Sequence, residues 1–182
     1  MPQHDRKLSL DELERPSAEA HRDRPKLQIR LLLDDVRSRH NVGSIFRTAD
    51  AFGAEEIILC GFTPRPPHRE IEKSALGATL SVPWTAEPDA LEAIKRSKAE
   101  GYRIVAVEQT RLAIPLNSLS IEPSEPIVLV FGNELTGVTD AVIEASDTCV
   151  VIPQFGSKHS LNVSVCAGVV LWWCSRGMRS TE

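Results

Sequence analysis

The feature that most constrains the fold is the stretch from Val151 to Cys174, which reads V-I-P-Q-F-G-S-K-H-S-L-N-V-S-V-C-A-G-V-V-L-W-W-C. A strand is expected to end at Ile152, because Pro153 has no backbone N–H and cannot continue it. Residues 161–174 are apolar on nearly every side and predict a helix in the protein interior. This helix is too short to span a bilayer, which needs about 20 apolar residues.

Two polar side chains stand at the start of this helix, Ser160 and Asn162. A buried hydroxyl or amide costs about 1–3 kcal/mol unless something hydrogen-bonds it. One interpretation is that Ser160 caps the helix and Asn162 bonds to nearby backbone. The other is that a ligand binds at this end of the helix, and the remaining motifs have to decide between the two.

The rest of the chain alternates between strand and helix patterns. Strands are expected at residues 29–35, 56–61, 80–84, 103–107, 127–132 and 148–152, and helices at residues 41–52, 89–100, 139–145 and 161–174. Asn41 is expected to cap the first helix and Gly53 to end it in a left-handed conformation. This alternation predicts an α/β fold, a parallel sheet flanked by helices on both faces, with ligands bound at the carboxyl ends of the strands.

Length and composition favour one domain with a tail. The 182 residues, 42% of them hydrophobic, suffice for one sizeable core. Residues 1–26 are rich in charge and proline and are expected to form a weakly ordered arm, with residues 27–182 as the domain. The net charge is −4, yet residues 1–48 hold ten Lys or Arg against eight Asp or Glu. An RNA partner is therefore permitted but not implied.

Cysteine and hydropathy patterns indicate a cytoplasmic protein without a structural metal. No two of the four cysteines have C-x-x-C spacing, and the five histidines have no metal-ligand spacing. Reduced, buried thiols are therefore expected. The chain starts without the apolar segment of a signal peptide, and no apolar run is long enough to cross a membrane.

Common nucleotide-binding motifs are absent. No G-x-G is present, which argues against a dinucleotide-binding turn, and G-N-E-L-T-G-V-T lacks the lysine of a P-loop. What remains are three polar loops, each directly after a strong strand. They contain N-V-G-S-I-F-R within residues 35–47, G-N-E-L-T-G at 132–137, and P-Q-F-G-S-K-H-S-L-N at 153–162.

In this order, and with the last loop running into a carboxyl-terminal helix, the three loops resemble the signature motifs of the SpoU (TrmH-like) family of the SPOUT RNA methyltransferases. The resemblance covers residues 29–173. It implies a deep trefoil knot near the carboxyl terminus, a homodimer, and transfer of a methyl group from S-adenosylmethionine to a ribose 2'-hydroxyl of RNA. The knot runs against the general rule for protein chains and could not be inferred from periodicity.

The resemblance also implies roles for individual residues. The catalytic set would be Asn41, Arg47, Glu134, Ser160 and Asn162. The cofactor would be held mainly by backbone around Val107, Gly132, Ile152 and Leu161. No residue of the motifs is replaced, so an active enzyme is expected rather than a non-catalytic module that binds S-adenosylmethionine or RNA. An oxidoreductase on an ordinary doubly wound sheet would need a glycine motif that the chain lacks.

The chemistry requires help for the ribose hydroxyl, which must lose its proton as it attacks the methyl carbon. The family is usually described with the motif arginine, here Arg47, as a general base. A guanidinium has a pKa above about 12 and accepts protons poorly. We therefore expect Arg47 to bind the adjacent phosphate and stabilise developing negative charge. Outside this motif, a solvated arginine on a helix surface would be the default interpretation.

The other motif residues have simpler interpretations beside the functional one. Asn41 can cap a helix, orient Arg47 or contact the ribose, and Glu134 can pair with Arg47 or brace its loop. Basic residues near the first motif and after the second strand are candidate phosphate contacts, although such charges are often only solvated surface. They are Arg37, Arg39, His40, Arg65 and Arg69. The K-S-A-L-G-A stretch resembles tRNA-directed members, which favours tRNA over rRNA.

Overall fold

A single sheet of seven parallel strands organises the protein, seen in a computed structural model that describes residues 6–9, 11–123 and 125–179. The strand order is β3-β2-β1-β6-β4-β7-β5, and every neighbouring pair is parallel. All carboxyl ends therefore lie at one edge. The strands are β1 (Leu27–Asp34), β2 (Ala54–Cys60), β3 (Trp84–Glu87), β4 (Arg103–Val107), β5 (Ile114–Pro115), β6 (Ile127–Phe131) and β7 (Thr148–Val151).

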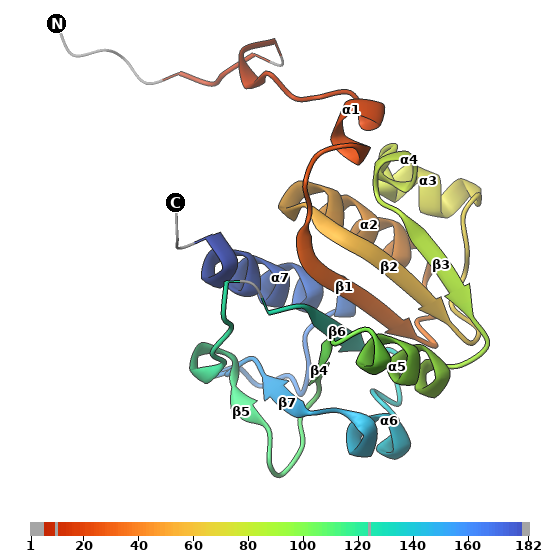
Figure 1. The fold of residues 1–182 in the computed structure, drawn as a ribbon, viewed down its shortest axis with the longest axis vertical. Helices are drawn as coiled ribbons and strands as arrows, with labels where there is room; N and C mark the ends of the chain where they lie inside the picture. Colours follow the sequence, from red (N-terminus) through yellow and green to blue (C-terminus); the bar gives the residue numbers. More distant parts are fainter. Residues whose placement is uncertain (1–5, 10, 124, 180–182) are drawn as a thin grey trace, which may run out of the picture.

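Helices cover both faces of the sheet (Figure 1). Residues of α2 and α7 join the core on one face, and residues of α5 and α6 join the core on the other. The helices are α1 (Ala18–Arg22), α2 (Arg39–Phe52), α3 (Arg69–Ala75), α4 (Ala78–Ser81), α5 (Ala90–Ala99), α6 (Asp140–Ala145) and α7 (Val163–Arg179), with 3-10 turns η1 (Asp11–Leu13) and η2 (Leu116–Ser118). The predicted parallel α/β sheet with helices on both faces is confirmed.

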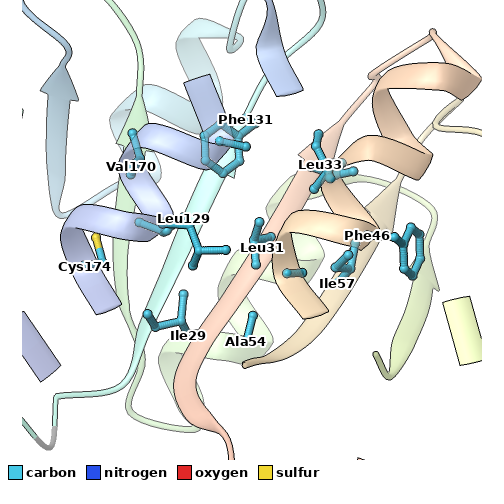
Figure 2. Packing of buried hydrophobic residues seen from close by; sticks show 14 of the residues in the cluster. Ile29, Leu31, Leu33, Phe46, Ala54, Ile57, Leu129, Phe131, Val170 and Cys174 are labelled. Carbon is cyan, nitrogen blue, oxygen red and sulfur yellow. The ribbon is translucent and has the colours of Figure 1, made fainter. Parts of the chain in front are cut away.

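Alternation along the central strands builds two cores. On β1, Leu31 and Leu33 point toward α2 and α7, whereas Leu32 points toward α5 and α6. Figure 2 shows Leu31 of β1 beside Leu129 of β6, and in this view Val170 of α7 lies on the other side of β6 from β1. Since both faces are buried, the strands read as continuous apolar runs instead of alternating ones.

Several local predictions agree with the structure. The strand predicted at residues 103–107 has the bounds of β4. Gly53 ends α2 with φ of 71°, a conformation that glycine adopts without steric cost. The helix predicted from residue 89 is α5, which Asp89 caps by accepting a hydrogen bond from the Glu92 N–H. These signals are local in sequence, so a sequence reading can capture them.

Other local predictions are wrong. The strand expected at residues 80–84 is displaced: α4 occupies Ala78–Ser81, and β3 begins only at Trp84. Residues 114–119, where no strand or helix was predicted, contain the two-residue strand β5. Asn41 does not cap α2, because Ser38 lies at the cap position and its Oγ accepts a hydrogen bond from the Asn41 N–H.

The last helix is longer than predicted and less buried. Helix α7 begins at Val163 and runs to Arg179, and its inner side packs against α2. Its outer side keeps Val165 and Trp172 about half exposed, with exposures of 53% and 48%. The expectation of a helix buried all round is therefore wrong for the single chain. No helix in the described part of the chain is long and apolar enough to cross a membrane.

A buried carboxyl group lies at the end of β1. Asp34 is 8% exposed and belongs to the face of the sheet that α5 covers. Burial, assisted by the nearby charges of Asp35 and Asp89, raises the pKa of Asp34 to about 6. Because this pKa lies above the ordinary value near 3.9, ionised Asp34 destabilises the folded state above pH 6, and the penalty disappears as the pH falls toward 4.

Replacing Asp34→Asn should therefore stabilise the protein at pH 7.5 by about 1–3 kcal/mol, because an uncharged amide avoids the cost of a buried charge. The gain should fade between pH 6 and 4. Urea unfolding at a series of pH values measures it, with Asp23→Asn on the exposed surface as the matched control. An Asp34→Asn variant no more stable than wild type at pH 7.5 would contradict this interpretation.

Candidate active site

The carboxylate of Glu134 joins the loop after β6 to the loop after β1. Its Oε2 accepts a hydrogen bond from the Arg37 N–H at 2.9 Å, and its Oε1 accepts from the Ser38 N–H at 3.0 Å. The Asn41 side chain donates a further bond from Nδ2 to Oε1 at 2.9 Å. Of the two roles considered for Glu134, bracing its loop is the one that these contacts support.

Asn41 carries the connection to the third motif. Its side chain is buried, and its Oδ1 accepts a hydrogen bond from Asn162 Nδ2 at 3.1 Å. Asn162 in turn accepts bonds from the backbone N–H and the hydroxyl of Ser164 through its Oδ1, which fixes the first turn of α7. Asn162 therefore bonds to nearby helix backbone, as the capping interpretation expects. It also bonds to Asn41 of the first motif, 121 positions away, which the capping interpretation alone does not explain.

Hydrogen bonding also lowers the pKa of Glu134. Partial burial acts to raise that pKa, but the bonds from Arg37, Asn41 and Ser38 stabilise the carboxylate and outweigh burial. An ionised carboxylate is thus held at the junction of the loops at neutral pH.

The loop after β6 is a tight turn with little freedom. Asn133 Oδ1 accepts bonds from the N–H groups of Leu135 and Thr136, and Asn133 Nδ2 donates to the Asp35 carbonyl at 2.8 Å. Gly137 has φ of 70°. A Cβ at Gly132 would lie 2.3 Å from the carbonyl carbon of Gly137, so only glycine allows the two backbone segments to come this close.

A cavity of about 420 Å³ lies between these loops, within the usual range of about 300–1,000 Å³ for small-molecule sites. It forms where the carboxyl ends of β4, β6 and β7 meet. All four residues proposed to hold the cofactor line it, together with three of the proposed catalytic residues. These seven are Val107, Gly132, Ile152 and Leu161, and Glu134, Ser160 and Asn162.

The lining of this cavity suits a ligand that is partly apolar and carries positive charge. Phe131, Val150 and Ile152 supply apolar contact, and the side chains of Glu108 and Glu134 supply carboxylates. Backbone groups near Gly132 are free of side-chain shielding and can bond a flat ring system or an amino acid moiety. Among the residues that the structure describes, no Lys, Arg or His side chain lines the cavity, so its lining supplies no cationic group that could stabilise an oxygen that becomes negative.

Arg47 lies outside this cavity. It is an exposed residue on α2, in the turn where α2 packs beside α7, and it is not among the residues that line the cavity in the same chain. Within the described residues the structure therefore assembles four of the five proposed catalytic side chains, Asn41 standing directly behind Glu134, but does not bring Arg47 to them.

The proposed phosphate contacts lie on the loops after β1 and β2 and in the first turns of the helices that follow them, α2 and α3. All five are exposed, and the loops are tied to one another through Asp35, whose Oδ1 accepts a bond from the Phe62 N–H. Arg39 forms an ion pair with Glu70 at 3.7 Å. The five residues are Arg37, Arg39, His40, Arg65 and Arg69.

Sequence reasoning missed Glu108 and Gln109, which follow β4. Glu108 Oε2 accepts a hydrogen bond from the Val138 N–H at 2.9 Å and thereby fixes the turn after β6. Gln109 Nε2 donates to the His159 carbonyl at 2.6 Å and holds the loop before α7. Their position in the sequence could have identified them, because both are polar and directly follow a buried strand. In a parallel sheet, ligands bind at that end of the strands.

Comparison with known proteins places the chain in a family. Residues 28–172 match the model of the SpoU rRNA Methylase family. The chain is 31% identical to a tRNA (guanosine(18)-2'-O)-methyltransferase of Aquifex aeolicus over 149 residues, 79% of this chain and 66% of that protein. It is 34% identical to the 23S rRNA (guanosine-2'-O-)-methyltransferase RlmB of Nitrosomonas europaea over 142 residues, 78% of this chain and 54% of that protein.

Solved structures agree. The A. aeolicus TrmH/SpoU tRNA modifying enzyme superimposes with a TM-score of 0.79 at 26% identity, covering 90% of this chain and 83% of that one. The AdoMet-bound rRNA methyltransferase of Sinorhizobium meliloti gives 0.78 at 31% identity, covering 88% and 61%. The fold and motifs define a parallel α/β protein with a cavity at the strand ends, and the chain belongs to the SpoU rRNA Methylase family. It spans about half to two thirds of the curated relatives above.

The bonds around Glu134 predict a specific pH dependence. In Glu134→Gln, an NH2 group replaces one carboxylate oxygen and leaves a backbone N–H facing another donor, so the variant should lose about 1–2 kcal/mol at pH 7. Because the folded pKa of Glu134 is depressed, its stabilisation is present above the ordinary pKa near 4.3 and is lost as the pH falls through the folded value. The difference from wild type should therefore shrink below about pH 4.3.

Guanidinium unfolding between pH 3 and 7 measures this difference, with Glu144→Gln on the exposed surface of α6 as the control. A difference that stays constant over this pH range would show that the Glu134 charge does not hold the loops together.

Proposed function

We propose that the protein transfers a methyl group from S-adenosylmethionine to the 2'-hydroxyl of a ribose in RNA. The observation that carries the proposal is that the second and third motif loops line one cavity, while the first motif is joined to them through the bonds of Asn41 to Glu134 and Asn162. The names of the relatives support the same reaction, since those proteins are 2'-O-methyltransferases of tRNA or rRNA.

S-adenosylmethionine fits the residues that line the cavity. Val107, Ile152 and Leu161 offer apolar and backbone contacts to the adenosine, and the close approach of backbone at Gly132 leaves room beside the turn. Glu108 and Glu134 supply negative charge near a cationic ligand. When bound, S-adenosylmethionine supplies an activated methyl group on a sulfonium. The chain supplies the groups that hold it and exclude water.

Arg47 is the residue proposed to act on the RNA. A guanidinium holds phosphate through two parallel N–H bonds and stabilises an oxygen that becomes negative as the 2'-hydroxyl attacks. This role suits its exposed position on α2 better than that of a general base. Because Arg47 does not line the cavity of its own chain, we propose that in a dimer it acts at the cavity of the partner subunit.

The outer face of α7 supports such a homodimer. Val165, Val169 and Trp172 recur at helical spacing and are 38–53% exposed. The Cβ position of Gly168 lies 3.8 Å from the Thr48 side chain of α2, so this apolar stripe and the helix that carries Arg47 form adjacent surfaces. A second copy on the stripe would bury the exposed apolar side chains and bring the two α2 helices near the opposite chains.

The strand order supports the trefoil knot. β7 lies between β4 and β5, two strands joined only by residues 108–113. β7, the last strand in the chain, therefore lies beneath the connection formed by residues 108–113. From the end of β7 the chain must pass this connection to reach α7, which packs against α2. The bond from Gln109 to the His159 carbonyl joins the connection to the segment that leaves.

The substrate is proposed to be tRNA, on the resemblance of the K-S-A-L-G-A stretch at α3 and α4 to tRNA-directed members. Arg37, Arg39, His40, Arg65 and Arg69 are the proposed phosphate contacts. Residues 27–182 would form the catalytic domain and residues 1–26 an arm, and the proposed location of the protein is the cytoplasm.

The methylation assay tests the function. Incubation with labelled S-adenosylmethionine and, separately, tRNA or rRNA fragments should label one pool at a ribose 2'-oxygen, located by mass spectrometry of nucleosides. Arg47→Ala should lower the rate at least 100-fold and Arg47→Lys nearly as much, because an ammonium cannot form the paired bonds of a guanidinium. Near-normal rates for Arg47→Lys would contradict this role, and binding without transfer by wild type would indicate a non-catalytic module.

A mixed-dimer experiment tests whether Arg47 acts across subunits. Arg47→Ala and Asn162→Ala, each nearly inactive alone, are unfolded and refolded together at equal concentration. If Arg47 serves the partner's cavity, random pairing should restore about a quarter of wild-type activity, because half the dimers then hold one intact site. No recovery, in a mixture shown by tagged subunits to contain hybrid dimers, would mean that Arg47 serves the cavity of its own chain.

A further inference from the structure

The side chain of Phe62 is an exposed aromatic on a rigid loop. It follows β2 directly and is 88% exposed. Its backbone is nevertheless fixed, since its N–H donates to Asp35 Oδ1 at 2.7 Å. Gly61 before it has φ of 60°, and a Cβ there would lie 2.2 Å from Asp35 Oδ1. The loop is therefore shaped by close contact with the loop after β1, and its aromatic ring is left in solvent.

The residue after Phe62 anchors the loop from the other side. Thr63 is 2% exposed, its hydroxyl donates to the Leu33 carbonyl at 3.0 Å, and the same oxygen accepts from the Val36 N–H at 3.1 Å. The anchored backbone fixes where the ring is presented, so ordering the ring against a ligand costs mainly side-chain rotamer entropy. The exposed ring offers a large apolar face that a flat group can cover.

The charges around Phe62 favour nucleic acid over an apolar protein surface. Arg37 lies on the loop to which Phe62 is bonded, and Arg65 lies on the loop of Phe62 itself, both exposed. Arg39 begins α2 directly after the first of these loops, where it is exposed and paired with Glu70. The nearby Asp35 carboxylate is engaged by the Phe62 N–H. Cations beside an exposed ring match a single strand of RNA, whose phosphates take the cations and whose unpaired bases stack on the ring.

The loop after β1, to which Phe62 is bonded, is also bonded to residues at the cavity. The Asp35 carbonyl accepts a bond from Asn133 Nδ2 at 2.8 Å, and the Arg37 N–H donates to Glu134, which lines the cavity. β2, β1 and β6 are neighbours in the sheet, and their strands lie about 4.8 Å apart. The ends of β2 and β6 are thus only about 10 Å apart, which places Phe62 beside any strand that leaves the cavity along this edge.

We propose that Phe62 stacks against an unpaired base of the RNA substrate, close to the nucleotide that is methylated, while the neighbouring arginines hold the phosphates. The inference rests on the proposed function and deepens it. It means that the substrate is single-stranded at this point, in a loop or a bulge, because a base within a duplex has no free face. Phe62 is then a substrate-binding residue that the motifs of the family do not include.

Three variants separate stacking from apolar contact: Phe62→Trp, Phe62→Leu and Phe62→Ala. The wild type is first assayed on unfractionated tRNA and on 23S rRNA fragments to find which pool it methylates. RNA affinity of each variant is then measured by filter binding with that pool. Phe62→Ala and Phe62→Leu should both weaken binding about 5- to 100-fold and raise KM for RNA, since stacking is worth about 1–3 kcal/mol per base. Phe62→Trp should bind as wild type or more tightly.

The controls isolate the effect. Leu112→Ala removes an equally exposed apolar side chain, 90% exposed, from the loop after β4 and should leave RNA affinity unchanged. Calorimetric titration with S-adenosylmethionine should give the same affinity for all Phe62 variants, and light scattering the same oligomeric state. Ultraviolet cross-linking of the bound RNA should yield a peptide that contains Phe62 in the wild type.

The outcomes distinguish the stacking role from the function on which it rests. Methylation by wild type combined with unchanged binding by Phe62→Ala, or with wild-type binding by Phe62→Leu, overturns the stacking role alone. A Phe62→Ala variant that changes oligomeric state instead of RNA affinity also overturns it, because the ring would then bind a second copy of the chain. A wild type that methylates neither RNA pool overturns the proposed function and the stacking role together.

Discussion

The arrangement of the site depends on one carboxylate. Glu134, on the turn after β6, accepts bonds from two backbone N–H groups of the loop after β1 and from the Asn41 side chain, and Asn41 accepts a bond from Asn162 at the start of α7. Three segments that are far apart in sequence are thereby fixed at the same edge of the sheet. Neutral groups could fill the same space, but an ionised acceptor can hold several donors at once and at short distance.

The sheet explains why these loops can meet at all. Because every strand is parallel, each loop that follows a strand begins at the same edge, and β1, β6, β4 and β7 are consecutive neighbours there. The glycines of the turn after β6 allow backbone to approach backbone, which leaves a cavity between that turn and the segment before α7. The core on both faces of the sheet holds this edge in place, while the residues that face solvent remain available for RNA.

How much the sequence could predict follows the range of each signal. Gly53 as a helix end and the bounds of β4 were predictable because they depend on a few adjacent residues. The cavity-lining positions were predictable from the motif resemblance and from the rule on strand ends. Ser38 as the cap of α2 was missed although its signal is local, because Ser38 and Asn41 are both favoured cap residues three positions apart. The two-residue strand β5 and the half-exposed face of α7 were not predictable, because each depends on what packs nearby in three dimensions. Arg47 was predicted from its motif, but no sequence pattern could predict that it lies outside the cavity of its own chain.

The central claim is that the second and third motif loops, braced by the first, form the site for S-adenosylmethionine. A crystal structure of the protein grown with S-adenosylhomocysteine, the product of methyl transfer, tests it most directly. The account predicts the adenosine between the turn after β6 and the segment that precedes α7, in contact with backbone at Gly132, Ile152 and Leu161, and with the bonds among Glu134, Asn41 and Asn162 intact. Density for the ligand elsewhere, or a closed cavity in crystals that contain saturating ligand, would contradict it.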